Sequence, residues 1–161
     1  MRATLAHPIF GPLPFNCVTP EYEMNIEFRS EIPASHQFYQ LFQTTGWNEK
    51  YRLSPEELAQ ALRSSWFVLS AYDGEQLVGF GRLVSDGVLH AMIYELIVLP
   101  EYQGQGIGGI ILEKLVEKCQ ESGVRDIQLF CACGKRAFYE KRGFVARPED
   151  APGMQYIRAG G

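Results

Sequence analysis

With 161 residues, 46% of them apolar and 21% charged, the chain has the size and composition of one globular domain rather than of a disordered chain. Its net charge of -4 offers no basic surface, and no apolar run is long enough to span a bilayer, so neither nucleic acid nor a membrane is expected as a partner. The four cysteines are too few for a disulfide framework and lack zinc-ligand spacing, which predicts reduced, buried thiols, no metal and a cytoplasmic location.

Residues 1–23 are rich in proline and follow neither a helical nor an alternating pattern, so they predict an extended arm or extension. A strand-like segment opens directly after Met24, which makes Met24 a candidate start of a single domain over 24–161. The arm also lacks the apolar core and cleavage site of a secretion signal.

Alternating polar and apolar residues predict strands, and apolar residues three or four apart predict helices. Strands are expected at 25–29, 66–72, 76–84, 88–99, 126–131, 144–147 and 154–158. Helices are expected at 34–45, 54–64, 110–122 and 135–141. Ser54 and Glu57 can form a capping box around Pro55. Because a helix connects the strand at 88–99 to the strand at 126–131, that pair should be parallel, in an otherwise antiparallel sheet.

A glycine-rich loop, Gly104-Gln105-Gly106-Ile107-Gly108-Gly109, stands between the strand at 88–99 and the helix that follows. Glycine permits a positive φ and removes the Cβ that would keep a ligand from the backbone. Free N–H groups can then point at an anion from the positive end of the helix dipole. The loop therefore predicts a phosphate-binding site.

NAD and ATP are two phosphate ligands that bind to such loops, and the rest of the sequence disfavours both of them. Its pattern matches the G-x-G-x-x-G of NAD-binding folds, but there the fingerprint follows the first strand, whereas here about 100 residues precede it. The Lys-Ser/Thr pair of an ATP-binding P-loop does not follow the glycines.

Two motifs together resemble the Gcn5-related N-acetyltransferase (GNAT) family. Gln103, Gly106 and Gly108 meet its Q/R-x-x-G-x-G/A motif, and a later F-Y-x-x-x-G-F is met from Phe138 to Phe144. The resemblance covers about residues 25–158 and is strongest to small bacterial members, with a more distant similarity to arylalkylamine (serotonin) acetyltransferases. It implies the α/β (α+β) GNAT fold, a twisted, mixed and mostly antiparallel sheet of about seven strands flanked by about four helices.

The resemblance implies acetyl-CoA as co-substrate, with its pyrophosphate on the glycine loop. The implied contacts are Gln103, Gly104, Gln105, Gly106, Ile107, Gly108 and Gly109. Beside a bulge, the backbone of Leu96, Ile97 and Val98 is expected to pair with pantetheine and to polarise the thioester carbonyl. An asparagine common in the family is replaced here by Cys131-Ala132-Cys133-Gly134, and Lys135 is a candidate contact for a CoA phosphate.

Acetylation of an amine needs two proton transfers, because the amine arrives as an ammonium ion and the coenzyme leaves as a thiolate. By its place in the motif, Tyr139 matches the family's general acid. Glu95 is a carboxylate inside an apolar strand, which is costly unless it faces a cleft or a partner. We therefore expect Glu95 to act as the base, directly or through water, with a structural hydrogen bond as the alternative.

The acceptor is expected to be the primary amine of a small molecule, similar to an arylalkylamine or a polyamine, acetylated by direct attack in a ternary complex. Candidate lining residues are Phe42, Trp47, Tyr51, Tyr94, Asp150 and Met154. Two alternatives remain open, a protein or peptide acceptor and a non-catalytic acyl-CoA-binding or regulatory module. The oligomeric state is left as monomer or homodimer.

Overall fold

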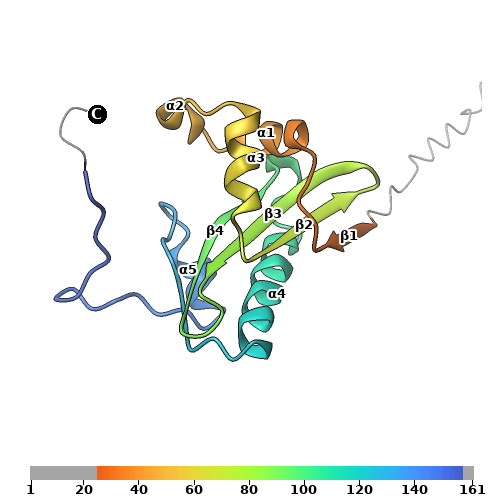
Figure 1. Cartoon of the computed structure of the whole chain (residues 1–161). Helices are drawn as coiled ribbons and strands as arrows, with labels where there is room; N and C mark the ends of the chain where they lie inside the picture. The colour runs from red at the N-terminus through yellow and green to blue at the C-terminus, as the bar shows by residue number, and fades with distance from the viewer. Residues whose placement is uncertain (1–24, 158–161) are drawn as a thin grey trace, which may run out of the picture.

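The computed structural model describes residues 25–157 (Figure 1), so the predicted arm at 1–23 lies outside the described residues. The strands are β1 (Ile26–Arg29), β2 (Phe67–Asp73), β3 (Gln76–Ser85), β4 (His90–Val98) and β5 (Asp126–Leu129). The helices are α1 (Ser35–Gln43), α2 (Asn48–Tyr51), α3 (Pro55–Arg63), α4 (Ile107–Glu121) and α5 (Arg136–Glu140), with a 3-10 turn η1 (Pro100–Tyr102).

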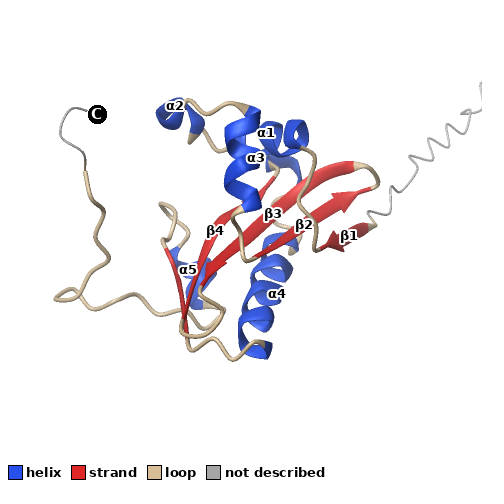
Figure 2. Cartoon of the chain, viewed as in Figure 1, coloured by secondary structure: helices blue, strands red, loops and turns tan. Residues whose placement is uncertain are grey.

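The strands form one sheet in the order β1-β2-β3-β4-β5 (Figure 2). Neighbours are antiparallel except β4 and β5, which are parallel, as the helical connection between them predicts. The two edge strands are four residues long, whereas the three inner strands have seven to ten. The mixed sheet and the α+β class are thus confirmed.

The described residues contain five strands rather than seven, and five helices rather than four. Neither 144–147 nor 154–157 forms a strand. A short alternating pattern makes a strand only where a neighbour completes the hydrogen bonds and covers the apolar side chains, and here Val145 is 89% and Tyr156 86% exposed. The unpredicted helix is α2, which is stabilised by the buried Asn48: its side chain accepts from the Leu53 amide (2.9 Å) and donates to the Leu53 carbonyl (3.0 Å).

The predicted burial of the thiols is wrong for two of them. Cys119 is buried, but Cys131 and Cys133 are exposed. The reason is that β5 ends at Leu129, two residues before the predicted end, so both thiols lie in the loop that follows. Cys17 lies outside the described residues.

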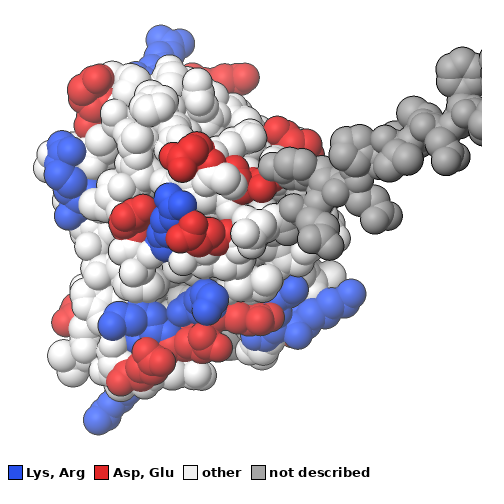
Figure 3. Space-filling view, turned by 90° about the vertical axis from the view of Figure 1, so that its right-hand side faces the viewer, with Lys and Arg blue, Asp and Glu red and all other residues white. Residues whose placement is uncertain are grey.

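Helices cover both faces of the sheet, with α4 on one face and α1 and α3 on the other (Figure 1). Phe38 of α1 packs edge-on against Phe80 of β3, with ring centroids 4.7 Å apart. The capping box at the start of α3 is present, because Ser54 accepts from the Glu57 amide and Glu57 accepts from the Ser54 amide. Phe38 thus packs α1 against the sheet, and α3 packs beside α1. On the face shown in Figure 3, acidic and basic side chains are interspersed and form no basic patch.

Close packing of α4 on β3 depends on two glycines. Gly79 and Gly81 both lie beneath Ile111 of α4, and a Cβ at either position would come within 3.0 Å of that side chain. Ile111 itself is fully buried. The glycines therefore set how closely α4, and with it the glycine loop at its start, approaches the sheet.

Gly81→Ala should lower the free energy of unfolding by about 1–3 kcal/mol, the usual penalty for overpacking a core. The added Cβ would lie 2.8 Å from Ile111 Cγ2. Gly108→Ala is the matched control, because a Cβ there would be 3.4 Å or more from its neighbours. Urea unfolding of both variants measures the difference, and equal losses of stability would contradict the packing argument.

Candidate active site

A cleft of about 1340 Å³ opens where β4 and β5 separate. The two strands pair only from His90 and Asp126 to Ile93 and Leu129. Beyond Ile93, β4 continues to Val98 with β3 as its only described neighbour. The edge of β4 that faces the cleft therefore carries backbone groups without a strand partner.

A β-bulge marks the start of this free edge. Phe80 pairs with Ile97 and Arg82 with Tyr94, which leaves one extra residue on β4. Glu95, within the bulge, has a φ of 45°. A positive φ is uncommon for a residue other than glycine, and such strain costs about 1–3 kcal/mol and gathers at functional sites. The bulge expected from the family resemblance is present.

Glu95 is held by an ion pair with Arg82 on the neighbouring strand. The Arg82 Nε donates to one carboxylate oxygen, and Nη2 lies 3.4 Å from the other. Both side chains are largely buried, with 13% and 21% exposed. The Arg82 guanidinium also lies over the ring of Tyr94, 5.4 Å from its centroid, and Nη1 lies 3.4 Å from the Ser65 hydroxyl. The Glu95 carboxylate thus has a fixed position in the cleft wall.

The glycine loop has the geometry of an anion site. Gly104 and Gly106 have φ values of 78° and 87°, and Gly106 caps α4 without any side-chain hydrogen bond. The first turn of α4 holds no acidic residue. Its N–H groups have no acceptor within the helix, so the positive end of the helix dipole faces the cleft. Glycine at 106 also explains why α4 begins at Ile107, three residues earlier than predicted.

At the end of β4 next to the glycine loop, backbone polar groups point toward the cleft. The Leu99 amide donates to the Val78 carbonyl on β3 (2.9 Å), so the alternation of a strand points the polar groups of Val98 the other way. The Gln103 side-chain amide donates to the Val98 carbonyl (3.0 Å). Gln103 therefore fixes the loop against β4, and the Val98 N–H remains directed at the cleft.

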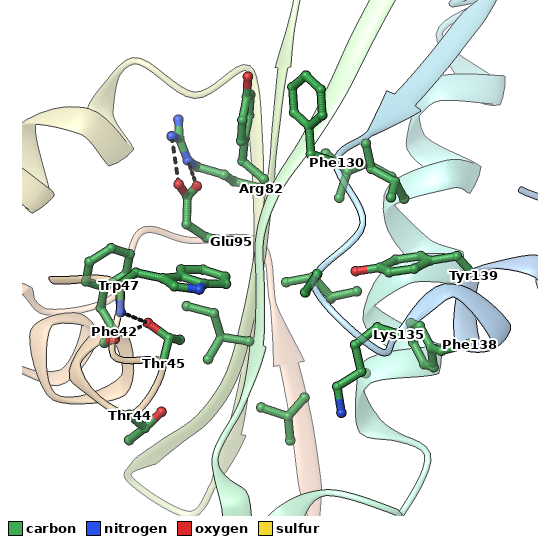
Figure 4. A pocket seen from close by; sticks show the side chains of 18 of the residues that line it. Phe42, Thr44, Thr45, Trp47, Arg82, Glu95, Phe130, Lys135, Phe138 and Tyr139 are labelled. Carbon is green, nitrogen blue, oxygen red and sulfur yellow. Dashed lines mark hydrogen bonds and ion pairs between the residues drawn. The ribbon is translucent and has the colours of Figure 1, made fainter. Parts of the chain in front are cut away.

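Tyr139 reaches the cleft from α5. It is half-buried, with its ring edge-on to Phe138 and Phe144 at 5.0 and 6.1 Å. Burial, with a smaller contribution from the charge of Cys131, raises its pKa above the ordinary value of 10.0. The phenol is therefore protonated across neutral pH and can donate a proton. In Figure 4 its hydroxyl points into the cleft on one side of β4, while Glu95 and Trp47 lie on the other side.

Most of the predicted site residues line this one cleft. They are Phe42, Trp47, Tyr51, Tyr94, Glu95, Leu96, Ile97, Val98, Gln103, Gly104, Gly106, Ile107, Gly108, Gly109, Lys135, Tyr139 and Met154. Gln105 and Asp150 are not among the lining residues; the Gln105 side chain donates instead to the Glu101 carbonyl (3.1 Å).

Sequence reasoning missed Arg82, Phe130 and Arg142, which also line the cleft. Arg82 could have been found, because a basic residue inside one apolar strand of a hairpin can neutralise an acidic residue in the next strand. Phe130 could not, because its exposure results from the early end of β5.

Arg142 fastens α5 to the first turn of α4. Its Nη1 donates to the Phe138 carbonyl (3.0 Å), and its guanidinium lies 4.2 Å from the centroid of the Phe138 ring. Its buried Nε has no hydrogen-bond partner in the described part of the chain, with Glu113 at 3.6 Å. A Cβ on Gly109 would come within 2.4 Å of Nη2. Gly109 therefore makes room for Arg142, which ties the helix of Tyr139 to the glycine loop.

No helix within 25–157 is long and apolar enough to cross a membrane. No group of three or more His, Cys, Asp or Glu side chains in the same range could hold a metal ion.

The model of the acetyltransferase (GNAT) family matches residues 32–144, and the chain belongs to this family. GNAT enzymes use acetyl-CoA, and the glycine loop, the Val98 N–H and the open cleft fit that co-substrate.

Relatives include an uncharacterized N-acetyltransferase, ycf52, of Pyropia yezoensis, 28% identical over 74% of this chain and 69% of that protein. The chloroplastic serotonin N-acetyltransferase 2 of Oryza sativa is 33% identical over 67% of this chain and 56% of its own length. A solved structure of a probable acetyltransferase from Staphylococcus aureus is 26% identical, with a TM-score of 0.73 over 84% of this chain and all of that one. Because several relatives are named chloroplastic, the cytoplasmic location stays a prediction.

Gly109→Ala tests the link between Arg142 and α4. Alanine gains about 1 kcal/mol of helix propensity over glycine, but its Cβ displaces the guanidinium and its charged hydrogen bond, worth about 1.5–3 kcal/mol. The substitution should therefore destabilise the native chain yet stabilise an Arg142→Ala variant. Urea unfolding of the four proteins of this cycle measures the effect, and the same change in both backgrounds would rule the link out.

Proposed function

We propose that this enzyme acetylates the primary amine of a small molecule by direct attack of the amine on acetyl-CoA in a ternary complex. The observation that carries the proposal is the placement of Tyr139 and Glu95 on opposite sides of the free edge of β4 (Figure 4). A proton donor on one side and a carboxylate on the other suit a reaction in which the thioester carbon lies between them.

Acetyl-CoA supplies the acetyl group as a thioester. The glycine loop would hold the pyrophosphate, with Lys135 next to a CoA phosphate, and the Val98 N–H would bind pantetheine. Glycine at position 108 would leave room for pantetheine, because a Cβ there would lie 3.4 Å from the Val98 side chain and narrow the space between the loop and β4. Backbone donors near the bulge would polarise the thioester carbonyl.

Glu95 would take the proton of the ammonium ion through a water molecule, since Arg82 already engages its carboxylate. The free amine then forms the new C–N bond while the C–S bond breaks. Tyr139 would give its proton to the departing sulfur, and the second proton lost by the attacking nitrogen would return the phenolate to a phenol. Each positioned acid or base contributes roughly 10²- to 10⁴-fold to such a reaction.

An aromatic wall supports an arylalkylamine as acceptor. Phe42 and Trp47 pack edge-on with ring centroids 5.9 Å apart, and Tyr51 and Tyr94 line the same cleft. Aromatic faces attract cations, and Glu95 adds a carboxylate. The name of the Oryza sativa relative points to the same class of amine.

A peptide acceptor is the second candidate, favoured by the exposed apolar side chains of Met154 and Tyr156 on the rim of the cleft. A screen that reads free thiol release separates the two, using arylalkylamines, polyamines and lysine peptides. Release with arylalkylamines and none with peptides is expected. Binding of acetyl-CoA without release for any amine would instead support a non-catalytic acyl-CoA-binding module.

Tyr139→Phe should lower kcat at least about tenfold and leave the affinity for acetyl-CoA nearly unchanged, because it removes one acid and little else. The raised pKa of Tyr139 keeps the phenol protonated to higher pH than an ordinary tyrosine. Wild-type activity should therefore persist through neutral pH and fall only in the alkaline range where the phenol ionises, and Tyr139→Phe should lack this fall. Initial rates and pH profiles of both proteins test whether Tyr139 is the acid. Unchanged turnover in Tyr139→Phe would exclude that role. Tyr39→Phe is the control outside the cleft.

Glu95→Gln should lower kcat by about 10²-fold or more if the carboxylate accepts the proton of the amine. The substitution also removes the charge that Arg82 neutralises, so thermal unfolding and acetyl-CoA binding are measured beside the rate. Glu117→Gln on α4, which does not line the cleft, is the control. A variant with reduced stability but full kcat would assign Glu95 a purely structural role.

A further inference from the structure

Two exposed thiols have no part in the proposed acetyl transfer. Cys131 and Cys133 form a C-x-C loop between β5 and α5, and both are free. The loop is a tight turn in which the Lys135 amide donates to the Ala132 carbonyl (3.0 Å), and Gly134 has a φ of 72°. Exposed cysteines are open to thiol–disulfide exchange, whereas a buried thiol such as Cys119 is not.

The C-x-C loop belongs to the wall of the cleft. Cys133 and Lys135 line the same cavity as Gly104 and Gly106 of the glycine loop. Cys131 is close enough to Tyr139 for its charge to contribute to the raised pKa of that phenol. The two thiols are therefore grouped with the proposed acid, on the side of β4 where the sulfur of the coenzyme would lie.

We propose that Cys131 and Cys133 form a dithiol site that reacts with the disulfide form of CoA. This inference rests on the proposed function, because the glycine loop must bind the pyrophosphate for the coenzyme sulfur to approach the loop. The adenosine pyrophosphate of this ligand would bind in the cleft, and its S–S bond would react with the thiols.

The chemistry is two successive thiol–disulfide exchanges. The thiolate of Cys133 attacks one sulfur of CoA disulfide, an S–S bond forms between Cys133 and CoA, and one CoA thiolate leaves. The thiolate of Cys131 then attacks the Cys133 sulfur, and the second CoA thiolate leaves. The two cysteines are oxidised to a disulfide, CoA disulfide is reduced, and the two thiol protons pass to the released CoA.

A mixed disulfide at Cys133 would occupy the cleft and exclude acetyl-CoA. Acetyl transfer should therefore stop while the adduct persists and return on reduction. Cys131 shortens the life of that adduct, because a neighbouring thiol attacks without having to diffuse to it.

The test exposes the reduced, full-length protein to CoA disulfide and, separately, to glutathione disulfide at equal concentration. Cys131→Ser should trap an adduct of one CoA on Cys133, found by intact mass and peptide mapping. Cys133→Ser should take up CoA about tenfold more slowly or not at all, and Cys131→Ser should take up glutathione from its disulfide as slowly, because neither reaction gains from binding in the cleft. Cys17→Ser should behave as wild type.

Protection by desulfo-CoA, which binds without a thiol, completes the test. Its presence should slow adduct formation, and its binding is measured separately by thermal shift, with NAD as the negative control. Binding of desulfo-CoA together with equal reaction of both disulfides, or with an adduct on Cys17, would overturn the dithiol site and leave the proposed function intact. Absence of both binding and turnover would overturn the two together.

Discussion

Beyond Ile93, the backbone of β4 pairs with β3 on one side only, and the whole cleft depends on this asymmetry. The extra residue at the bulge bends the strand away from β5. The strained φ of Glu95 persists because Arg82 holds its carboxylate on the neighbouring strand. The ion pair thus fixes the position of the candidate base at the bulge, and loss of either partner would leave a largely buried charge uncompensated.

Glycines around the cleft serve two separate physical needs. Gly104 and Gly106 supply left-handed backbone, which turns amides toward an anion. Gly81 and Gly109 have ordinary dihedral angles and are needed for space, one beneath Ile111 and the other beneath Arg142. The sequence shows only that all four positions are glycine. The structure shows that two of them are needed for their backbone conformation and two for the absence of a side chain.

Local signals allowed the sequence to predict the hairpins, the capping box, the parallel pair and the glycine loop, and the family resemblance implied most of the other residues that gather in the cleft. What it could not predict depends on long-range pairing. The pattern at 144–147 is too short to distinguish a strand from an extended loop, and only the lack of a neighbour decides. The sequence offers Arg82 as a partner for Glu95, but the one-residue shift of register that the bulge introduces between their strands required the structure.

The four-residue length of β1 and β5 has a consequence for self-association. An edge strand is a template on which another chain can add a strand, and long, flat edges are the sites where sheets aggregate. Here the long strands lie inside the sheet, while each edge offers only a few backbone groups. Within the described residues, the unpaired backbone of β4 beyond Ile93 faces the cleft, so neither outer edge of the sheet presents a long open strand to its neighbours in a concentrated solution.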